Sequence, residues 1–266
     1  MDIKLVAIDL DDTLLDSGLK IAEECAKAIQ AARSKGVIVT LATGRMYSSA
    51  LPYAKELKVD VPLITYQGAL VKNSESQEII YFQPVPSDLA QEVINFFRTN
   101  KVHHHSYFDD KLYMENLTEE GLRYARLAGV EPNLTKDLLQ DVVEKKALKI
   151  MAVNKNEDLL GELELALKER YGDKLNITKS KPYYLEISNR KANKGDALKV
   201  IADRYNVKRE QVLAIGDSYN DLDMIKWAGI GVAMGNAFDV VKEAADYVTK
   251  TNEEHGVAEA LYKFVL

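Results

Sequence analysis

Short apolar runs alternate with longer helical patterns along the first part of the chain. Residues 4–10 predict a strand buried on both faces, because their apolar side chains are continuous rather than alternating. Residues 19–35 carry apolar side chains at helical spacing. Residues 37–45 and 62–66 repeat the strand pattern, with a second helix predicted between them. Strands of this kind, alternating with helices, predict a parallel sheet covered on both faces.

The same pattern returns near the end of the chain. Residues 193–207 predict a helix, and "QVLAIG" (211–216) predicts a strand that runs into a polar loop and another helix. Short strands are predicted at 229–234 and 246–249, with a helix between them. The two ends of the chain are therefore expected to build one sheet together, which makes the fold class α/β.

The middle of the chain has a different pattern. "VHHHSYFDDKLYME" predicts two alternating strands joined by the turn pair Asp109 and Asp110. Further elements follow, with strands at 147–154, 175–180 and 183–188 and a helix at 157–170. We therefore predict two domains, a discontinuous core of residues 1–83 and 189–266 and an inserted α+β domain of residues 84–188.

The composition narrows the class of protein without defining an activity. Of the 266 residues, 47% are hydrophobic and 29% are charged, as is typical of soluble proteins. The net charge of −6 argues against nucleic acid as a partner. The single cysteine, Cys25, excludes an intramolecular disulfide. The first residues do not resemble a signal peptide and no apolar run is long enough to span a bilayer, so we expect a cytoplasmic protein with no membrane partner.

Polar residues gather where the predicted strands end. Because ligands of open α/β sheets bind at the carboxyl ends of the strands, these residues are candidates for a site. A lone pair of aspartates is weak support, but acidic clusters at two strand ends with a threonine at a third form a narrower pattern. The residues in question are Asp9, Asp11 and Asp12; Thr43, Gly44 and Arg45; Gln67 and Gly68; and Gly216, Asp217, Ser218, Asn220 and Asp221.

Four segments together resemble the motifs of the haloacid dehalogenase (HAD) superfamily of aspartate-nucleophile phosphatases. They are "DLDDTLLD" (9–16), "TGR" (43–45), "KG" (194–195) and "GDSYNDLDMI" (216–225). Nearly the whole chain is similar to the Cof-type branch, whose members carry an α+β cap. This resemblance implies a HAD-like, Rossmann-like parallel sheet core and a cap formed by the inserted domain.

The resemblance also implies the roles of the site residues. Asp9 is expected to be the nucleophile that forms an aspartyl-phosphate, and Asp11 the general acid and base. Mg²⁺ is expected as cofactor, because a carboxylate facing a phosphate dianion needs a cation between them. The expected ligands are the side chains of Asp9 and Asp217 with the backbone carbonyl of Asp11, and Asp221 is expected to orient Lys194 or metal-bound water. The expected phosphate-binding residues are Thr43 (through its hydroxyl and loop amide), Gly44, Arg45, Lys194 and Asn220.

Each of these assignments has a simpler structural alternative. The acidic residues after the first strand could form a turn before a helix, and those after residue 216 could cap one. Arg45 is as compatible with a structural or rim position as with substrate contact. Lys194 competes with Lys191 and Lys199 in the same lysine-rich stretch. For "HHH" (103–105), three-fold metal ligation is awkward on a strand, so we expect a strand that partly faces solvent.

The combined pattern predicts an Mg²⁺-dependent phosphatase of small phosphorylated metabolites, such as sugar phosphates or a phosphorylated cofactor precursor. A phosphomutase or phosphotransferase would use the same motifs, and a non-catalytic metabolite-binding protein is a further alternative. A phosphorylatable receiver domain is excluded, because its phosphorylated Asp follows the third strand, where this chain has Tyr66 and Gln67. One departure concerns the substrate, because Cof-type relatives usually have Asn-Gly-Ala where this chain has Gln67-Gly68-Ala69.

Overall fold

The computed structural model of the protein describes residues 2–59 and 61–266 and divides into two compact units. The core unit comprises Met1–Phe82 with Asn193–Leu266, and the inserted unit is Gln83–Ala192. The second boundary lies a few residues beyond the predicted one. The cause is strand β11 (Tyr184–Asn189), which continues to pair Asn189 with Leu175. The Asn189 side chain also donates to the carbonyl of Pro84 at 2.7 Å, which ties the two ends of the inserted unit together.

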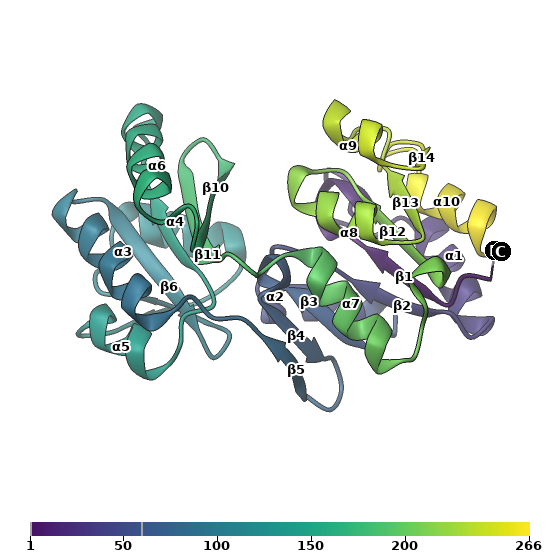
Figure 1. Cartoon of the computed structure of the whole chain (residues 1–266), viewed down its shortest axis with the longest axis horizontal. Coiled ribbons are helices and arrows are strands. Elements are labelled where there is room, and N and C mark those ends of the chain that lie inside the picture. Colours follow the sequence, from purple (N-terminus) through teal and green to yellow (C-terminus); the bar gives the residue numbers. More distant parts are fainter. Residues whose placement is uncertain (1, 60) are drawn as a thin grey trace. The chain divides into compact units, whose positions relative to one another are not determined.

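A five-stranded parallel sheet forms the centre of the core unit (Figure 1). Its strand order is β14-β13-β12-β1-β2, and every neighbouring pair is parallel. The strands are β1 (Leu5–Ile8), β2 (Ile38–Leu41), β12 (Val212–Gly216), β13 (Ile230–Ala233) and β14 (Tyr247–Val248). The predicted sheet built from both ends of the chain is therefore confirmed, and with it the α/β fold class.

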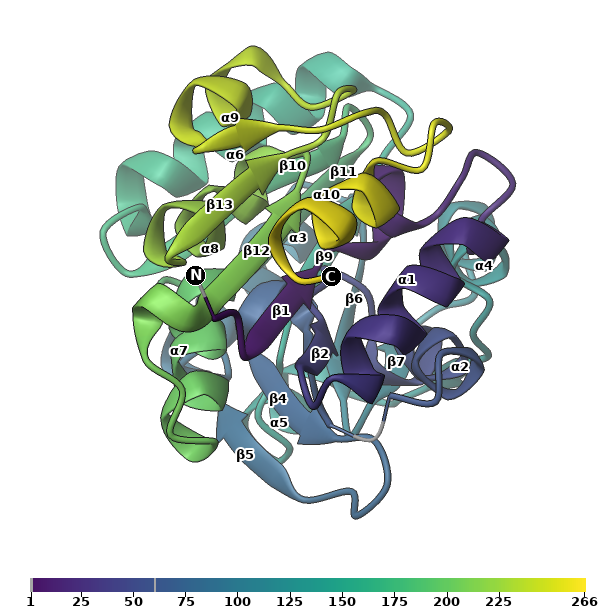
Figure 2. The same ribbon diagram turned by 90° about the vertical axis from the view of Figure 1, so that its right-hand side faces the viewer.

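Helices cover both faces of this sheet (Figure 2). Helices α7 and α8 lie on one face, where their apolar side chains pack with those of β1 and β12. Helices α1 and α10 lie together on the other face. The helices of the core unit are α1 (Glu23–Ser34), α2 (Tyr47–Glu56), α7 (Lys194–Arg204), α8 (Leu222–Trp227), α9 (Asp239–Ala244) and α10 (Gly256–Phe264).

The third predicted strand differs from expectation. Within the described residues, the backbone of strand β3 (Pro62–Thr65) pairs with the parallel sheet only at one bridge, between Ala42 and Ile64. It pairs instead with β4 (Leu70–Asn73), and β4 pairs with β5 (Ile79–Phe82), both antiparallel. The reason is a tight turn directly after β3, which reverses the chain before a helical crossover could begin. The hairpin of β4 and β5 was not predicted.

The inserted unit contains a six-stranded sheet with the order β10-β11-β9-β6-β7-β8. Its neighbouring strands are antiparallel except for β7 and β8. Asp109 and Asp110 both have positive φ and join β6 to β7, so the predicted hairpin is confirmed. The other strands of this sheet are β6 (His103–Phe108), β7 (Lys111–Met114), β8 (Pro132–Leu134), β9 (Ile150–Val153) and β10 (Leu175–Lys181).

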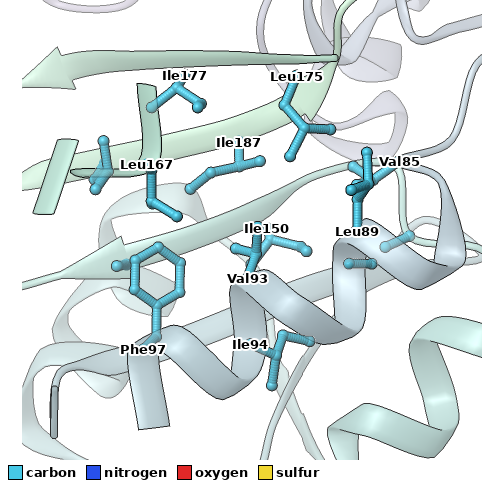
Figure 3. Close-up of a cluster of buried hydrophobic side chains, with 14 of the residues drawn as sticks. Val85, Leu89, Val93, Ile94, Phe97, Ile150, Leu167, Leu175, Ile177 and Ile187 are labelled. Carbon is cyan, nitrogen blue, oxygen red and sulfur yellow. The ribbon is translucent and has the colours of Figure 1, made fainter. Parts of the chain in front are cut away.

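One face of this sheet forms the hydrophobic core of the inserted unit (Figure 3). Side chains of α3, such as Val93 and Phe97, pack against Ile150 and Ile187 of the sheet and Leu167 of α6. The helices of this unit are α3 (Ser87–Thr99), α4 (Glu119–Ala128), α5 (Leu138–Glu144) and α6 (Glu157–Tyr171). The predicted helix at 157–170 and the inserted α+β domain are therefore confirmed.

Among the described residues, none of the helices has the length and apolar character that a membrane crossing requires.

The "HHH" segment lies on β6, but the expectation that it partly faces solvent is wrong for His105, which is fully buried. The ring of His103 hydrogen-bonds that of His105 at 3.1 Å, and His105 contacts the Tyr107 hydroxyl at 3.3 Å. Tyr107 in turn donates to the Tyr124 hydroxyl of α4 at 2.5 Å. Helix α4 therefore brings a partner to this face of the strand, which the strand's own sequence does not reveal.

Candidate active site

Three carboxylates follow β1, and the turn η1 (Leu10–Leu14) separates them. The backbone N–H of Asp9 donates to the carbonyl of Ile215 at 3.0 Å, which extends the pairing of β1 with β12 by one residue. Asp11 has an extended backbone and Asp12 a left-handed one, with φ of 58°. As a result the Asp9 side chain is buried, whereas that of Asp11 is 46% exposed and Asp12 is exposed.

A buried lysine bridges two of the aspartates in the site. Lys194 is the first residue of α7, and the Asn193 side chain caps this helix by accepting from the N–H of Asp196 at 2.7 Å. The ammonium of Lys194 donates to Oδ1 of Asp9 at 2.6 Å and to Oδ1 of Asp221 at 2.5 Å. Burial lowers the pKa of Lys194, but these two carboxylates raise it by more, so the pKa lies above its ordinary value.

Asp221 uses both of its carboxylate oxygens within the protein. Oδ1 accepts from Lys194, and Oδ2 accepts the backbone N–H groups of Asp217 and Ser218, each at 3.0 Å. A Cβ at Gly216 would lie 2.5 Å from Cγ of Asp221, so the strand end needs glycine to approach this carboxylate. This bonding suits Asp221 to orienting Lys194 and the loop of Asp217 rather than binding a metal directly.

Asp217 completes the acidic cluster and fits a cation site. One oxygen from each of Asp9, Asp217 and Asp221 can lie within 4.8 Å of the others. Burial, followed by the charge of Asp221, raises the pKa of Asp217 to about 7. Within the described part of the chain, Oδ2 of Asp9 and Oδ2 of Asp217 receive no hydrogen bond. An oxygen of the largely buried Asp217 carboxylate that has no protein donor is the kind of hard ligand that Mg²⁺ prefers, and the oxygen of Asp9 without a donor leaves that carboxylate able to react.

The Thr43–Arg45 loop follows β2, and its threonine is fully buried. The Thr43 hydroxyl oxygen accepts the N–H of Arg45 at 3.1 Å, which leaves its proton available to a ligand. The Thr43 backbone N–H is already committed to the carbonyl of Ile64 at 2.9 Å. In this structure the Thr43 N–H is therefore engaged, whereas the N–H of Gly44 has no partner among the described residues.

Arg45 is committed to Asp11. Its guanidinium donates from Nε to Oδ2 of Asp11 at 2.9 Å and from the terminal Nη2 to Oδ1 at 2.5 Å. The guanidinium also lies over the ring of Tyr53, 5.2 Å from its centroid. A bidentate pair of this kind fixes the direction of a carboxylate. The structure therefore places Arg45 against the candidate general acid.

The remaining candidates fall into two groups. Asn220 lies near the site, and its Nδ2 donates to Oε1 of Gln67 at 2.8 Å. Lys191 and Lys199 are exposed and neither is paired with the aspartates. Of the three lysines, the structure therefore pairs Lys194 with these aspartates.

Thr13 is a site residue that the sequence analysis did not single out. Its hydroxyl is buried and donates to Oδ1 of Asp217 at 2.9 Å, although the two residues are far apart in the chain. The available signal was its position two residues after Asp11, in the turn that follows the candidate nucleophile.

The fold and the site together define an α/β enzyme whose buried carboxylate–lysine cluster lies at the carboxyl ends of parallel strands. The sequence profile of the haloacid dehalogenase-like hydrolases matches residues 6–261. The chain therefore belongs to this family and is an enzyme of its phosphatase type, as the resemblance of the motifs predicted.

Individual relatives match over almost their full length. The 5-amino-6-(5-phospho-D-ribitylamino)uracil phosphatase YcsE of Bacillus subtilis is 35% identical, covering 100% of this chain and 97% of the relative. A protein from Thermotoga maritima with a known crystal structure is 36% identical in sequence to this chain, with a TM-score of 0.91. The match covers 99% of this chain and 98% of that one. A haloacid dehalogenase-like hydrolase from Bacteroides thetaiotaomicron is 35% identical, with a TM-score of 0.89, covering 98% and 99%.

Proposed function

We propose that the protein is an Mg²⁺-dependent phosphatase of small phosphorylated metabolites that works through an aspartyl-phosphate on Asp9. The observation that carries this proposal is the buried bridge of Lys194 between Asp9 and Asp221. A lysine held in this way fixes Oδ1 of Asp9 and leaves Oδ2 for attack. A carboxylate held facing the phosphorus is what an in-line phosphoryl transfer needs.

The proposed reaction has two transfers. In the first, Oδ2 of Asp9 forms a bond to phosphorus as the bond to the leaving alcohol breaks, and Asp11 gives its proton to the alcohol oxygen. In the second, Asp11 takes a proton from water as the water oxygen attacks the aspartyl-phosphate, which releases inorganic phosphate and restores Asp9. The hydroxyl of Thr43, the N–H of Gly44 and the ammonium of Lys194 are proposed to hold the phosphoryl oxygens.

The proposed metal ligands are the side chains of Asp9 and Asp217 and the backbone carbonyl of Asp11. When bound, Mg²⁺ supplies positive charge that offsets the repulsion between these carboxylates and a phosphate dianion. Asp221 is proposed to orient Lys194 and the backbone around Asp217, because both of its oxygens are engaged.

The proposed substrate is a phosphate monoester of a small polyhydroxylated metabolite or cofactor precursor. The name of the relative YcsE supports the inclusion of 5-amino-6-(5-phospho-D-ribitylamino)uracil in the first test. The other members of the panel are sugar phosphates, sugar alcohol phosphates and nucleotides.

The proposal is tested by Mg²⁺-dependent phosphate release from this panel by the wild-type protein and the Asp9→Asn and Asp11→Asn variants. We expect Asp9→Asn to abolish turnover and Asp11→Asn to reduce it by at least about 100-fold, since a positioned acid–base group contributes about 10²–10⁴-fold. Asp173→Asn, at an exposed aspartate of the inserted unit, is the matched control and should match the wild type.

Three outcomes separate the proposed function from its rivals. Phosphate release that requires both Asp9 and the metal supports the phosphatase. A rearranged sugar phosphate, or transfer to a second alcohol without release, would replace it with a mutase or phosphotransferase. An active Asp9→Asn variant would remove the nucleophile assignment.

A further inference from the structure

The turn η2 (Tyr66–Gly68) has an uncommon backbone. Tyr66, Gln67 and Gly68 all have positive φ, of 52°, 58° and 93°. Two consecutive non-glycine residues in this region are strained, and such strain persists where the surrounding structure enforces it, often at functional sites.

The turn is held against two other parts of the site by its backbone. The N–H of Tyr66 donates to the carbonyl of Arg45 at 2.9 Å, and the N–H of Gln67 donates to that of Thr43 at 3.1 Å. A Cβ at Gly68 would lie 2.1 Å from the carbonyl oxygen of Asn193, so the turn also presses against the start of α7. The turn therefore contacts both the Thr43–Arg45 loop and the segment that carries Lys194.

The side chain of Gln67 extends these contacts to a third part of the site. Its Oε1 accepts from Nδ2 of Asn220 at 2.8 Å. Its Nε2 lies against Gly44, where an added Cβ would be only 2.4 Å away. One amide group thus touches the loop after β2 at one end and the loop after β12 at the other.

We propose that Gln67 is a positioning residue, whose amide sets the spacing between Gly44 and Asn220 and thereby shapes the phosphoryl-binding pocket. This inference rests on the proposed function, in which the N–H of Gly44 helps to hold the phosphoryl oxygens. Gln67 acts through Asn220 and Gly44 rather than by bonding the substrate. The strained backbone places the amide between the two loops, and the length of glutamine allows it to reach both.

The test is a double-mutant cycle between Gln67 and Asn220. The proteins are the wild type, Gln67→Met, Asn220→Ala and the double variant, with Gln30→Met as the control at an exposed glutamine of α1. Methionine has nearly the length of glutamine and lacks the amide, so packing against Gly44 is largely kept. The measurements are kcat, KM, inhibition by inorganic phosphate, and the thermal unfolding temperature.

We expect Gln67→Met to raise KM and the inhibition constant of inorganic phosphate by about tenfold, as the loss of one well-placed hydrogen bond predicts. Because Gln67 acts through Asn220, the double variant should be no more than about twofold worse than Asn220→Ala alone. Gln67→Gly is a second variant that suits the left-handed backbone, and it should show the same rise in KM in a folded protein.

Several results would overturn this inference. One is a Gln67→Met protein with a lower unfolding temperature but unchanged KM and phosphate inhibition, which would make Gln67 purely structural. Another is a double variant whose defect is the product of the two single defects, which would make the residues independent. If wild type and Asp9→Asn behave as proposed while the Gln67 variants match Gln30→Met, this inference alone fails. If the wild type shows no Asp9-dependent release, the proposed function fails and this inference fails with it.

Discussion

At the scale of single residues, the site is organised by the assignment of each carboxylate oxygen to a partner. Both carboxylate oxygens of Asp221 accept hydrogen bonds from protein donors, whereas Asp9 and Asp217 each accept through one oxygen. Both oxygens of Asp11 accept from Arg45. Four aspartates that look alike in sequence therefore differ in what they can still bind. Asp11 is the most exposed of the four and the only one whose partner is a partly exposed arginine.

Thr13 provides a test of this partner assignment. Thr13→Val removes the hydroxyl that donates to Oδ1 of Asp217 while keeping the side-chain shape. Loss of a group that orients a ligand typically weakens metal affinity by about 10–100-fold, so we expect the Mg²⁺ concentration for half-maximal activity to rise by that factor. Thr178→Val, at an exposed threonine of β10, is the control. An unchanged Mg²⁺ dependence would show that the hydroxyl does not orient Asp217 toward a metal.

The residues of this site could be predicted unequally from sequence. The clustering of the aspartates could be predicted, because parallel strands bring their carboxyl ends to one edge of a sheet. These residues are Asp9, Asp11, Asp217 and Asp221. The pairing of Arg45 with Asp11 could not be predicted from the sequence, because it depends on how two loops meet in space. The same is true of the Thr13 hydroxyl and Asp217.

At the scale of elements, the main surprises come from the surroundings of a strand rather than from its own pattern. β3 has the apolar run of a buried parallel strand, yet the left-handed turn after it commits the chain to a hairpin. The first two residues of this turn, Tyr66 and Gln67, are neither glycine nor asparagine, so the sequence did not predict a left-handed backbone there. Strand β6 has the alternation that was expected, but α4 covers the face that carries His105.

The histidines of β6 predict a pH dependence of stability. Burial lowers the pKa of His103 from 6.5 to about 4 and that of His105 well below 6.5. Between pH 6.5 and about 4, the unfolded chain therefore binds a proton at His103 that the folded chain does not bind. The stability of the folded state consequently falls as the pH falls through this window. Across this pH window, we expect the titration of His103 to lower the free energy of unfolding by about 2–3 kcal/mol.

This contribution is measured as the slope of the unfolding free energy against pH in urea titrations. His103→Gln should be less stable at pH 7, because it alters the hydrogen bonds to His105 and Thr118, but its slope between pH 6.5 and 4 should be shallower. His255→Gln, at an exposed histidine of the core unit, controls for general acid effects. Identical slopes for wild type and His103→Gln would rule out the depressed pKa.

At the scale of the whole molecule, the inserted unit meets the requirements of an independent domain. Its six strands pair with one another, and its helices and sheet share one hydrophobic cluster. Its two ends are joined by the bond from Asn189 to Pro84. The core unit, by contrast, is made from two segments separated by the whole inserted unit.

We expect residues 83–192, expressed alone, to fold and to unfold cooperatively in urea. Circular dichroism and tryptophan-independent probes such as tyrosine fluorescence would follow the transition, since the single tryptophan of the chain, Trp227, lies in the core unit. A broad transition without cooperativity would show that this unit depends on the core for its stability. A matched protein that joins Phe82 to Asn193 through a short Gly/Ser linker tests the converse for the core unit.

The pairing of β1 with both β2 and β12 has a consequence for how the enzyme folds during its synthesis on the ribosome. β1 precedes the inserted unit in the chain, whereas its partner β12 begins at Val212 and is synthesised after the entire inserted unit. Asp9 meets Lys194 and the Asp217 loop through that late pairing. Since domains generally fold as units during synthesis, we expect the inserted unit to fold first on the nascent chain. The nucleophile would then acquire its surroundings only after β12 and the Asp217 loop have been synthesised, and a chain truncated before Val212 would carry Asp9 without a completed site.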